Sequence, residues 1–324
     1  MSTPEMPQPN DGLIRHTFGQ IPMAISFFQE YLPAEINSAV KWDEMKLLNS
    51  SFVDENLRQS ESDLLYEVPW TDEAAGPEAK GTKLLIYILF EHQSTLDPLM
   101  HIRLLEYLCR IWRRLAEKDA RKALLPPIIP FVLTHAVGGW KLSQQFHDRI
   151  QWPKSEPVRA ALEPLMPKFE HLLLDLCGTP LEALRGEPYV RLTLGVLKVR
   201  SQRDDGTWFD WAIPVIYDAQ KLGQGPLRTL FRYMFYAAEL KVEDFRAKIE
   251  ASPLFKETAE TIMTLADHLI AEGIEKGELV GQVRALQKFL GLAVDPTSTL
   301  ATQSKEQLEA QIERLTQTLD RRMS

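Results

Sequence analysis

Short apolar runs separated by turn signals dominate the first half of the chain. Two runs, residues 64–68 and 84–90, are rich in β-branched and aromatic residues, which predicts two strands. The segment between them contains Gly76, Pro77 and Gly81, so the two strands are expected to form a hairpin. Further strands are predicted over residues 47–53, 128–133 and 172–176.

Helical spacing of apolar residues fills the rest of the chain. Residues 11–32 and the segment that follows Asp97 repeat apolar residues every three or four positions, which predicts helices. Beyond about residue 180 hairpin signals disappear, and the pattern predicts helices over residues 181–200, 226–240, 242–254 and 261–290. The mixture predicts an α/β fold: a short mixed sheet flanked by helices, with a helical C-terminal extension.

Changes in pattern divide the chain into four segments. They are a polar start over 1–10 that is expected to be disordered, an α/β domain over 11–180, a helical extension over 181–260 and a helical tail over 261–324. In the tail, Ser304 is a predicted helix N-cap, and a seam of apolar residues follows it at steps of four, three and four: Leu308, Ile312, Leu315 and Leu319. The seam fits either self-association, with a homodimer favoured, or packing on the chain itself.

Composition narrows the class of protein. The chain has 324 residues, 44% of them hydrophobic, which is enough for a large buried core. Its two cysteines provide no disulfide framework and no signal peptide is expected at its start, so a cytoplasmic location is predicted. The apolar run over 84–90 is too short to span a bilayer, so no membrane partner is expected. The net charge of −8 disfavours general affinity for nucleic acid but permits a local basic patch.

The candidate chemistry is a pair of carboxylates at the ends of the predicted hairpin. If the hairpin folds about Pro77, facing residue numbers sum to about 154, and Asp63 then faces Glu91. Gln93 lies two positions further and points to the same side if the strand continues. Two close carboxylates repel unless a cation lies between them, and their oxygens suit a hard divalent ion. From these residues alone, solvated carboxylates at strand ends are the other interpretation.

Four stretches together resemble the recombination-promoting nuclease (Rpn) family, whose members are also described as YhgA-like putative transposases. The likeness covers about residues 11–180 and depends on the order and spacing of the stretches. They are Ser51-Phe52-Val53-Asp54-Glu55-Asn56-Leu57-Arg58 leading into Ser62-Asp63-Leu64-Leu65-Tyr66, then Phe90-Glu91-His92-Gln93-Ser94, then Pro98-Leu99-Met100 with Arg103-Leu104-Leu105-Glu106-Tyr107, and Pro127-Ile128-Ile129-Pro130-Phe131-Val132-Leu133-Thr134-His135.

The resemblance implies a PD-(D/E)xK nuclease core that cleaves DNA with the help of a divalent metal ion. Within the family pattern, Asp63, Glu91 and Gln93 match the catalytic positions. The metal would be held by Asp63, Glu91 and the backbone carbonyl of His92, with Mg²⁺ expected and Mn²⁺ or Ca²⁺ as alternatives. Gln93 stands where many related nucleases carry lysine, and a neutral amide orients a water or a phosphate oxygen but takes up no proton.

The predicted helix after the hairpin is locally basic. Residues 103–122 hold seven basic and three acidic side chains, in contrast to the acidic chain as a whole. Arg103, Arg110 and Arg114 fall on roughly one helical face, which suits contact with DNA phosphates. The alternative is a solvated helix face.

These features lead to one functional hypothesis and one alternative. The hypothesis is a divalent-metal-dependent DNA endonuclease that hydrolyses phosphodiester bonds, in DNA recombination or in defence against foreign DNA. The alternative is a catalytically inactive family member that acts as a DNA-binding or protein-interaction module. This alternative rests on the N-terminal motif. The family pattern has His-Asp and then Phe-Lys, whereas this chain has Asn10-Asp11-Gly12-Leu13-Ile14-Arg15, so the His and the Phe are replaced.

Overall fold

The structure is a computed structural model, and it describes residues 9–48, 64–75, 83–91, 97–118, 124–201, 208–222, 224–236, 242–255, 259–301 and 303–323. By its internal contacts the chain divides into two compact units. The first unit runs over Pro7–Leu254 and contains the sheet, and the second contains Phe255–Ser324.

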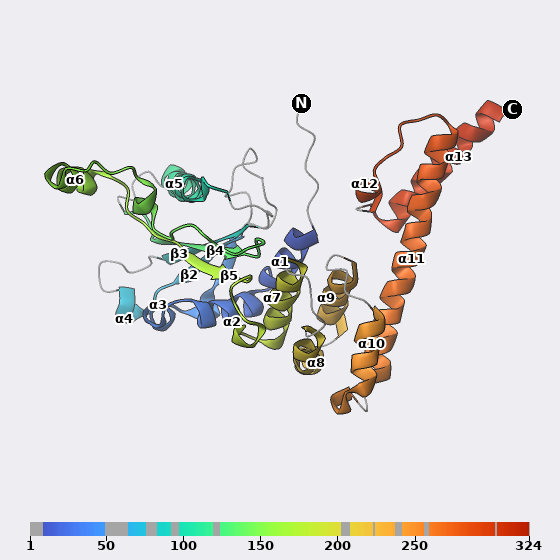
Figure 1. Ribbon diagram of the computed structural model, residues 1–324, viewed down its shortest axis with the longest axis horizontal. Coiled ribbons are helices and arrows are strands. Elements are labelled where there is room, and N and C mark those ends of the chain that lie inside the picture. Colours follow the sequence, from blue (N-terminus) through green and yellow to red (C-terminus); the bar gives the residue numbers. More distant parts are fainter. Residues whose placement is uncertain are drawn as a thin grey trace. The chain divides into compact units, whose positions relative to one another are not determined.

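A mixed sheet forms the centre of the first unit (Figure 1). It has five strands in the order β1-β2-β3-β4-β5. Neighbouring strands pair antiparallel from β1 to β3 and parallel from β3 to β5. The strands are β1 (Lys46–Leu48), β2 (Leu64–Pro69), β3 (Lys83–Glu91), β4 (Ile128–Thr134) and β5 (Leu172–Asp175). The predicted α/β class and the predicted hairpin of β2 and β3 are therefore confirmed.

The register of this hairpin differs from the predicted one by two residues. Leu65 faces Tyr87 and Val68 faces Leu84, so facing numbers sum to 152 and not to 154. The direct pairing of Asp63 with Glu91 therefore does not follow from the observed register. The connection between the strands contains the short helix α4 (Asp72–Ala75). A shift of two residues keeps the alternation of faces, because side chains in a strand repeat with a period of two.

Aromatic rings fill the sheet face that is covered by α1 (Pro9–Phe18), α2 (Ile21–Tyr31) and α7 (Pro188–Ser201). The ring centroids of Phe27 and Phe131 are 5.2 Å apart, and those of Phe28 and Tyr66 are also 5.2 Å apart, both in edge contact. The buried Tyr66 hydroxyl donates a hydrogen bond to the Phe18 carbonyl at 2.6 Å, and burial raises the pKa of this phenol. This bond satisfies the hydroxyl and ties the end of α1 to β2.

The opposite face is covered by α5 (Met100–Lys118), which connects β3 to β4 (Figure 1). Its apolar residues recur at helical spacing and pack on the side chains that alternate toward this face from β2, β3 and β4. The buried cluster consists of Leu65, Leu85, Met100, Leu104, Tyr107, Ile111 and Val132. The helix that apolar spacing predicted after Asp97 therefore forms, and it positions a polar outer surface above the sheet.

More helices complete the first unit. They are α3 (Ala34–Ala39), α6 (Glu156–Leu162), α8 (Trp208–Ala219), α9 (Gln224–Tyr236) and α10 (Val242–Ala251), with 3-10 turns at Trp42–Glu44, Phe146–Arg149, Glu163–Leu165, Leu181–Ala183, Gln220–Leu222 and Pro253–Phe255. The predicted division near residue 180 lies inside this unit, where α7 packs on α1 and α2. In the described part of the chain no helix is both long and apolar enough to cross a bilayer.

A helical hairpin forms the second unit, from α11 (Ala259–Phe289), the short α12 (Thr297–Ala301) and α13 (Lys305–Met323). The apolar seam of α13 contacts α11 and α12 of the same chain, where Val280, Val283, Leu300 and Leu308 are buried. Ile312 and Leu315 pack against this cluster. The apolar seam of α13 therefore packs within the chain, and self-association through this unit stays a prediction.

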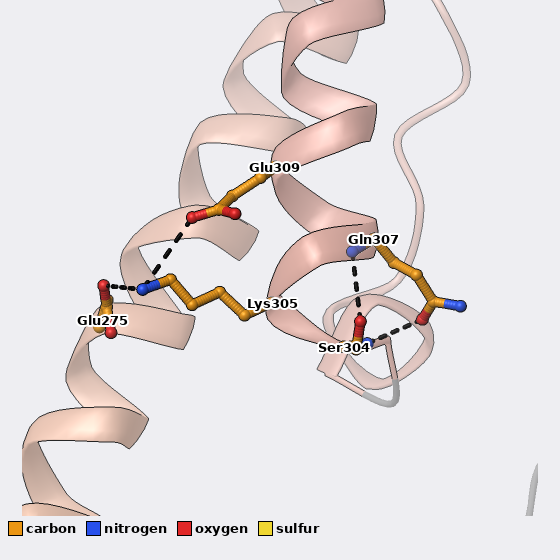
Figure 2. Close-up of polar contacts among 5 residues, drawn as sticks. All are labelled: Glu275, Ser304, Lys305, Gln307 and Glu309. Atoms are coloured by element: carbon orange, nitrogen blue, oxygen red, sulfur yellow. Dashed lines mark hydrogen bonds and ion pairs between the residues drawn. The ribbon is translucent and has the colours of Figure 1, made fainter.

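The start of α13 is fixed by a capping box (Figure 2). The Gln307 N–H donates to Ser304 Oγ at 3.3 Å, and the Ser304 N–H donates to Gln307 Oε1 at 2.8 Å. The reciprocal pair satisfies two N–H groups that a helix N-terminus otherwise leaves open, and it shows Ser304 in the predicted capping role. Lys305 adds an ion pair to Glu275 on α11, which links the two long helices.

Candidate active site at the carboxyl ends of the parallel strands

The carboxyl ends of β3, β4 and β5 meet at one edge of the sheet. Glu91 pairs with Thr134, and Thr134 pairs with Asp175, so the three positions form a row across the parallel strands. Paired positions share a face, and this row lies on the α5 face because it continues the alternation of Val132 and Leu173. In open α/β sheets, ligands bind at this edge.

The predicted catalytic residues are only partly within the described residues. Asp63, His92 and Gln93 lie outside them. Glu91 is the last residue of β3, and its backbone is at the carboxyl edge on the α5 face. The backbone of Glu91 lies at this edge, and both its role as a metal ligand and its convergence with Asp63 and Gln93 stay predictions.

Asp175 is a polar residue at this edge that sequence analysis did not select. Its Oδ2 accepts a hydrogen bond from the Trp140 N–H at 2.8 Å, and its Oδ1 accepts one from the Cys177 N–H at 3.0 Å. Gly139 lies in the left-handed region at φ 75°, and a Cβ there would lie 2.9 Å from Asp175 Oδ2. The carboxylate therefore binds the loop after β4 to the end of β5, and this close approach requires glycine at position 139.

Two buried histidines lie beside the same loop: His101 in the first turn of α5 and His171 directly before β5. The ring centroids of His101 and His171 are 5.3 Å apart, and Trp140 lies 5.3 Å from His171. His101 Nε2 is 2.7 Å from the Ser143 carbonyl, so this nitrogen carries the proton and donates. Burial lowers the pKa of both rings, and burial together with the neighbouring His101 lowers that of His171 to about 4. Both rings are therefore neutral at pH 7.

The three arginines predicted to contact DNA occupy different environments. Arg103 donates to Asp97 Oδ2 at 3.2 Å, and the side chains of both are about four-fifths buried. Asp97 also accepts the Leu99 N–H at 2.8 Å, so Arg103 belongs to the structure that starts α5. Arg114 is half-buried, whereas Arg110 is exposed and, in the described part of the chain, pairs with no carboxylate. Of the three, Arg110 has the exposed side chain, and its contact with DNA phosphates stays a prediction.

The predicted donor set fits a hard divalent cation in its chemistry. Asp63, Glu91 and a backbone carbonyl supply oxygen ligands, which Mg²⁺ and Ca²⁺ prefer. Elsewhere in the described ranges, no group of three or more histidine, cysteine, aspartate or glutamate residues is close enough to hold a metal ion. The strand ends near residues 63 and 91 therefore stay the predicted place for a divalent cation.

The order of the strands and the packing of α5 on one face of the sheet are consistent with the PD-(D/E)xK class of nuclease folds. The model of the family described as "Putative transposase, YhgA-like" matches residues 8–224, and the chain belongs to this family.

Several curated proteins are similar in sequence. Recombination-promoting nuclease RpnA of Escherichia coli (strain K12) is 27% identical over 277 residues, which cover 84% of this chain and 87% of RpnA. Recombination-promoting nuclease RpnD of Escherichia coli O157:H7 is 35% identical over 127 residues, 39% of this chain and 45% of RpnD. The inactive recombination-promoting nuclease-like protein RpnE of strain K12 is 24% identical over 272 residues, 83% of this chain and 84% of RpnE. No solved structure matches.

Proposed function

We propose that this protein is a divalent-metal-dependent DNA endonuclease that acts in DNA recombination. The observation that carries the proposal is the position of Glu91 at the carboxyl edge of the parallel strands, on the face covered by the basic helix α5. Relatives along most of the chain, such as RpnA, are named recombination-promoting nucleases, which supports a nuclease role. A carboxylate that binds a metal ion and a basic helix that contacts phosphates would suit hydrolysis of a phosphodiester.

The proposed role of each residue follows from the charge of its side chain. Asp63, Glu91 and the carbonyl of His92 would hold the cation, and Arg110 would contact a phosphate outside the reacting bond. When bound, a divalent cation supplies positive charge against the negative charge that develops on the phosphate and the leaving oxygen. Gln93 would orient the attacking water or a phosphate oxygen, because its amide donates and accepts hydrogen bonds but carries no charge.

Cleavage of a supercoiled plasmid by the full chain, with Mg²⁺, Mn²⁺ or Ca²⁺, tests the proposal. Asp63→Ala and Glu91→Ala should each slow single-turnover cleavage by roughly 100-fold or more, since each tenfold corresponds to about 1.36 kcal/mol. Glu67→Ala is the matched control, because Glu67 lies on the same sheet but pairs with Lys83 away from the edge. Its cleavage rate should match wild type.

DNA binding separates this proposal from a second candidate function. An inactive DNA-binding or protein-interaction module is favoured by relatives named inactive, such as RpnE, and by the altered residues at the start of α1. Equal cleavage by wild type and Asp63→Ala would show that the assigned carboxylates are wrong. DNA binding without cleavage in any of the three metals would favour the inactive module.

A further inference from the structure

The loop directly after β4 turns back at the carboxyl edge of the parallel strands, where the candidate active site lies. The Gly139 N–H donates to the Ala136 carbonyl at 3.0 Å, which closes a tight turn two residues after Thr134. Gly138 and Gly139 both lie in the left-handed region, at φ 86° and 75°, which glycine adopts without strain. The turn therefore brings the residues that follow it back toward the sheet edge.

Two contacts of Trp140 anchor this loop to the sheet. Its N–H donates to Asp175 Oδ2 at 2.8 Å, and Gly139 lies so close to the same oxygen that an added Cβ would be 2.9 Å from it. The ring of Trp140 packs against the buried cluster between α5 and the sheet. The backbone before Lys141 is therefore fixed on the α5 face, which is also the face of Glu91.

Lys141 is the first residue after this anchor, and its side chain is exposed. Its Nζ lies 3.7 Å from the position that a Cβ on Gly138 would take, so the ammonium group lies over the glycine turn. In the described part of the chain this ammonium group makes no ion pair or hydrogen bond. Val137 in the same loop is 65% exposed, so the loop is open to a large molecule. An unpaired cation is thus held at an open edge of the sheet.

The position of Lys141 suits a phosphate close to the candidate active site. Glu91, Thr134 and Asp175 follow one another across three strands, and adjacent strands lie about 4.8 Å apart, so the backbones of Glu91 and Asp175 are about 10 Å apart. Phosphates of one DNA strand recur every ~3.4 Å along the helix axis. A duplex whose reacting bond lies at Glu91 therefore carries other phosphates past the loop that Asp175 anchors.

We propose that Lys141 binds a DNA phosphate beside the reacting bond, and that Asp175 is the positioning residue that holds the loop of Lys141 in place. The inference rests on the proposed function and adds a substrate contact to the same site. An ammonium group contacts a phosphate as a point charge and reads no base, so the contact should hold DNA of any sequence. Because the bound phosphate is not the reacting one, loss of the contact should weaken DNA binding but leave the cleavage of bound DNA unchanged.

Lys141→Met tests the contact on the full chain, with Lys46→Met as the matched control. Lys46 is another exposed lysine of the sheet, but it pairs with Glu67 in the strand register and lies at the opposite edge, beside the amino end of β3. Binding of a labelled duplex is measured by fluorescence anisotropy without added metal ion, at several salt concentrations.

Lys141→Met should weaken binding about three- to tenfold and reduce the slope of log affinity against log salt by about 0.9, since one phosphate contact is lost. Lys141→Arg should restore both quantities, because it keeps the charge. Lys46→Met should match wild type. An unchanged slope in Lys141→Met would refute the contact.

Asp175→Asn tests the positioning role, because the role and the charge predict opposite results. Removal of a negative charge beside DNA should by itself strengthen binding. The two oxygens of Asp175 accept the N–H groups of Trp140 and Cys177, and an asparagine presents an N–H group in place of one of them. The loop should then come loose, and binding should weaken about threefold with the lost phosphate contact.

The double variant completes this test. In the Lys141→Met background, Asp175→Asn should cause no further loss, because the residue that it positions is already absent. Stronger binding by Asp175→Asn alone, or equal losses in the two backgrounds, would overturn the positioning role. Melting temperatures of all variants check that each is folded.

Plasmid cleavage separates this inference from the proposed function. With saturating DNA, single-turnover cleavage by Lys141→Met should equal that of wild type, and a tenfold loss would show contact with the reacting phosphate and contradict a place beside it. If wild type cleaves DNA and Lys141→Met binds it as tightly as wild type, the proposed function stands and this inference fails. If wild type neither binds nor cleaves DNA, both fail.

Discussion

Against α1, α2 and α7 the sheet presents aromatic rings in edge contact, whereas on the α5 face its apolar cluster is bordered by polar groups beside the loop after β4: two buried histidines and an aspartate that accepts backbone N–H groups. On the first face the buried Tyr66 hydroxyl has a partner in the Phe18 carbonyl. The second face leaves His101 Nδ1 and both nitrogens of His171 without a partner in the described part of the chain. The comparison teaches that both faces bury apolar side chains, but that the α5 face also keeps polar groups near the candidate active site.

The largest effect is expected on the aromatic face. Phe131→Ala removes a ring that is 1% exposed and touches Phe27, so unfolding free energy should fall by about 3–5 kcal/mol. Urea unfolding followed by circular dichroism measures the change. Phe289→Ala serves as the control, because that ring is 75% exposed and should change stability by less than about 0.5 kcal/mol. A loss under about 1 kcal/mol for Phe131→Ala would break the contrast between the faces.

A pH-dependent loss of stability is expected on the α5 face. The folded-state pKa of His171, about 4, lies below its ordinary value of 6.5, so the unfolded chain takes up a proton first as pH falls. The contribution of His171 is therefore complete above pH 6.5 and is lost between pH 6.5 and about 4. At about 1.36 kcal/mol per pKa unit it amounts to ~3 kcal/mol.

Melting temperatures across this pH range check the expectation against His171→Leu. Carboxylates also titrate there, so the difference between wild type and the variant isolates the histidine. The variant should lose less stability than wild type between pH 6.5 and 4. Parallel curves for the two proteins would show that His171 does not titrate as its burial predicts.

Two neighbouring glycines sharpen the comparison at the loop that Asp175 binds. Gly138 and Gly139 both lie in the left-handed region, at φ 86° and 75°, so alanine at either position is strained by about 1 kcal/mol or more. At position 139 the added Cβ also meets Asp175 Oδ2 at 2.9 Å, whereas at 138 the nearest atom, Lys141 Nζ, is 3.7 Å away. Gly139→Ala should therefore destabilise the protein by ~1 kcal/mol more than Gly138→Ala in urea unfolding. Equal losses would show that the Asp175 contact relaxes without cost.

The smallest effect concerns the outer surface of α5. Arg110→Ala should weaken DNA binding a few-fold and reduce the slope of log affinity against log salt by about 1, since it removes one phosphate contact. Arg103→Ala should leave that slope unchanged, because Asp97 already holds this arginine. Fluorescence anisotropy with a labelled duplex at several salt concentrations measures both. A larger slope change for Arg103→Ala would reverse their roles.

The apolar patterns predicted the strands and most helices correctly. Each of these elements buries one continuous face, so its buried positions recur regularly in the local sequence. The hairpin register was less accessible, since the connection between β2 and β3 contains α4 and the pairing is fixed by Leu65 and Leu85 packing under α5. Helical periodicity placed Arg103 on the same helix face as Arg110. It did not indicate that Arg103 forms an ion pair with Asp97, which lies just before the same helix.

The candidate site was predictable only in part. Glu91 at the end of β3 follows from a strand that ends in a carboxylate. The histidine pair does not follow, because His101 and His171 lie 70 positions apart and meet only when α5 covers the sheet. Asp175 carried only a weak signal, because it is an acidic residue at the end of an apolar strand. Its hydrogen-bond partner Trp140 is also remote in sequence.

The helical hairpin of the second unit has a consequence for the order in which the chain folds. Contacts that define the second unit are short-range: Gln287 and Asp295 bond to each other through two hydrogen bonds across the bend, and Lys305 reaches back to Glu275. The first unit instead needs β3 to find β4 across the whole of α5, and loop closure over such distances slows folding. The second unit is therefore expected to reach its structure in a shorter time than the first.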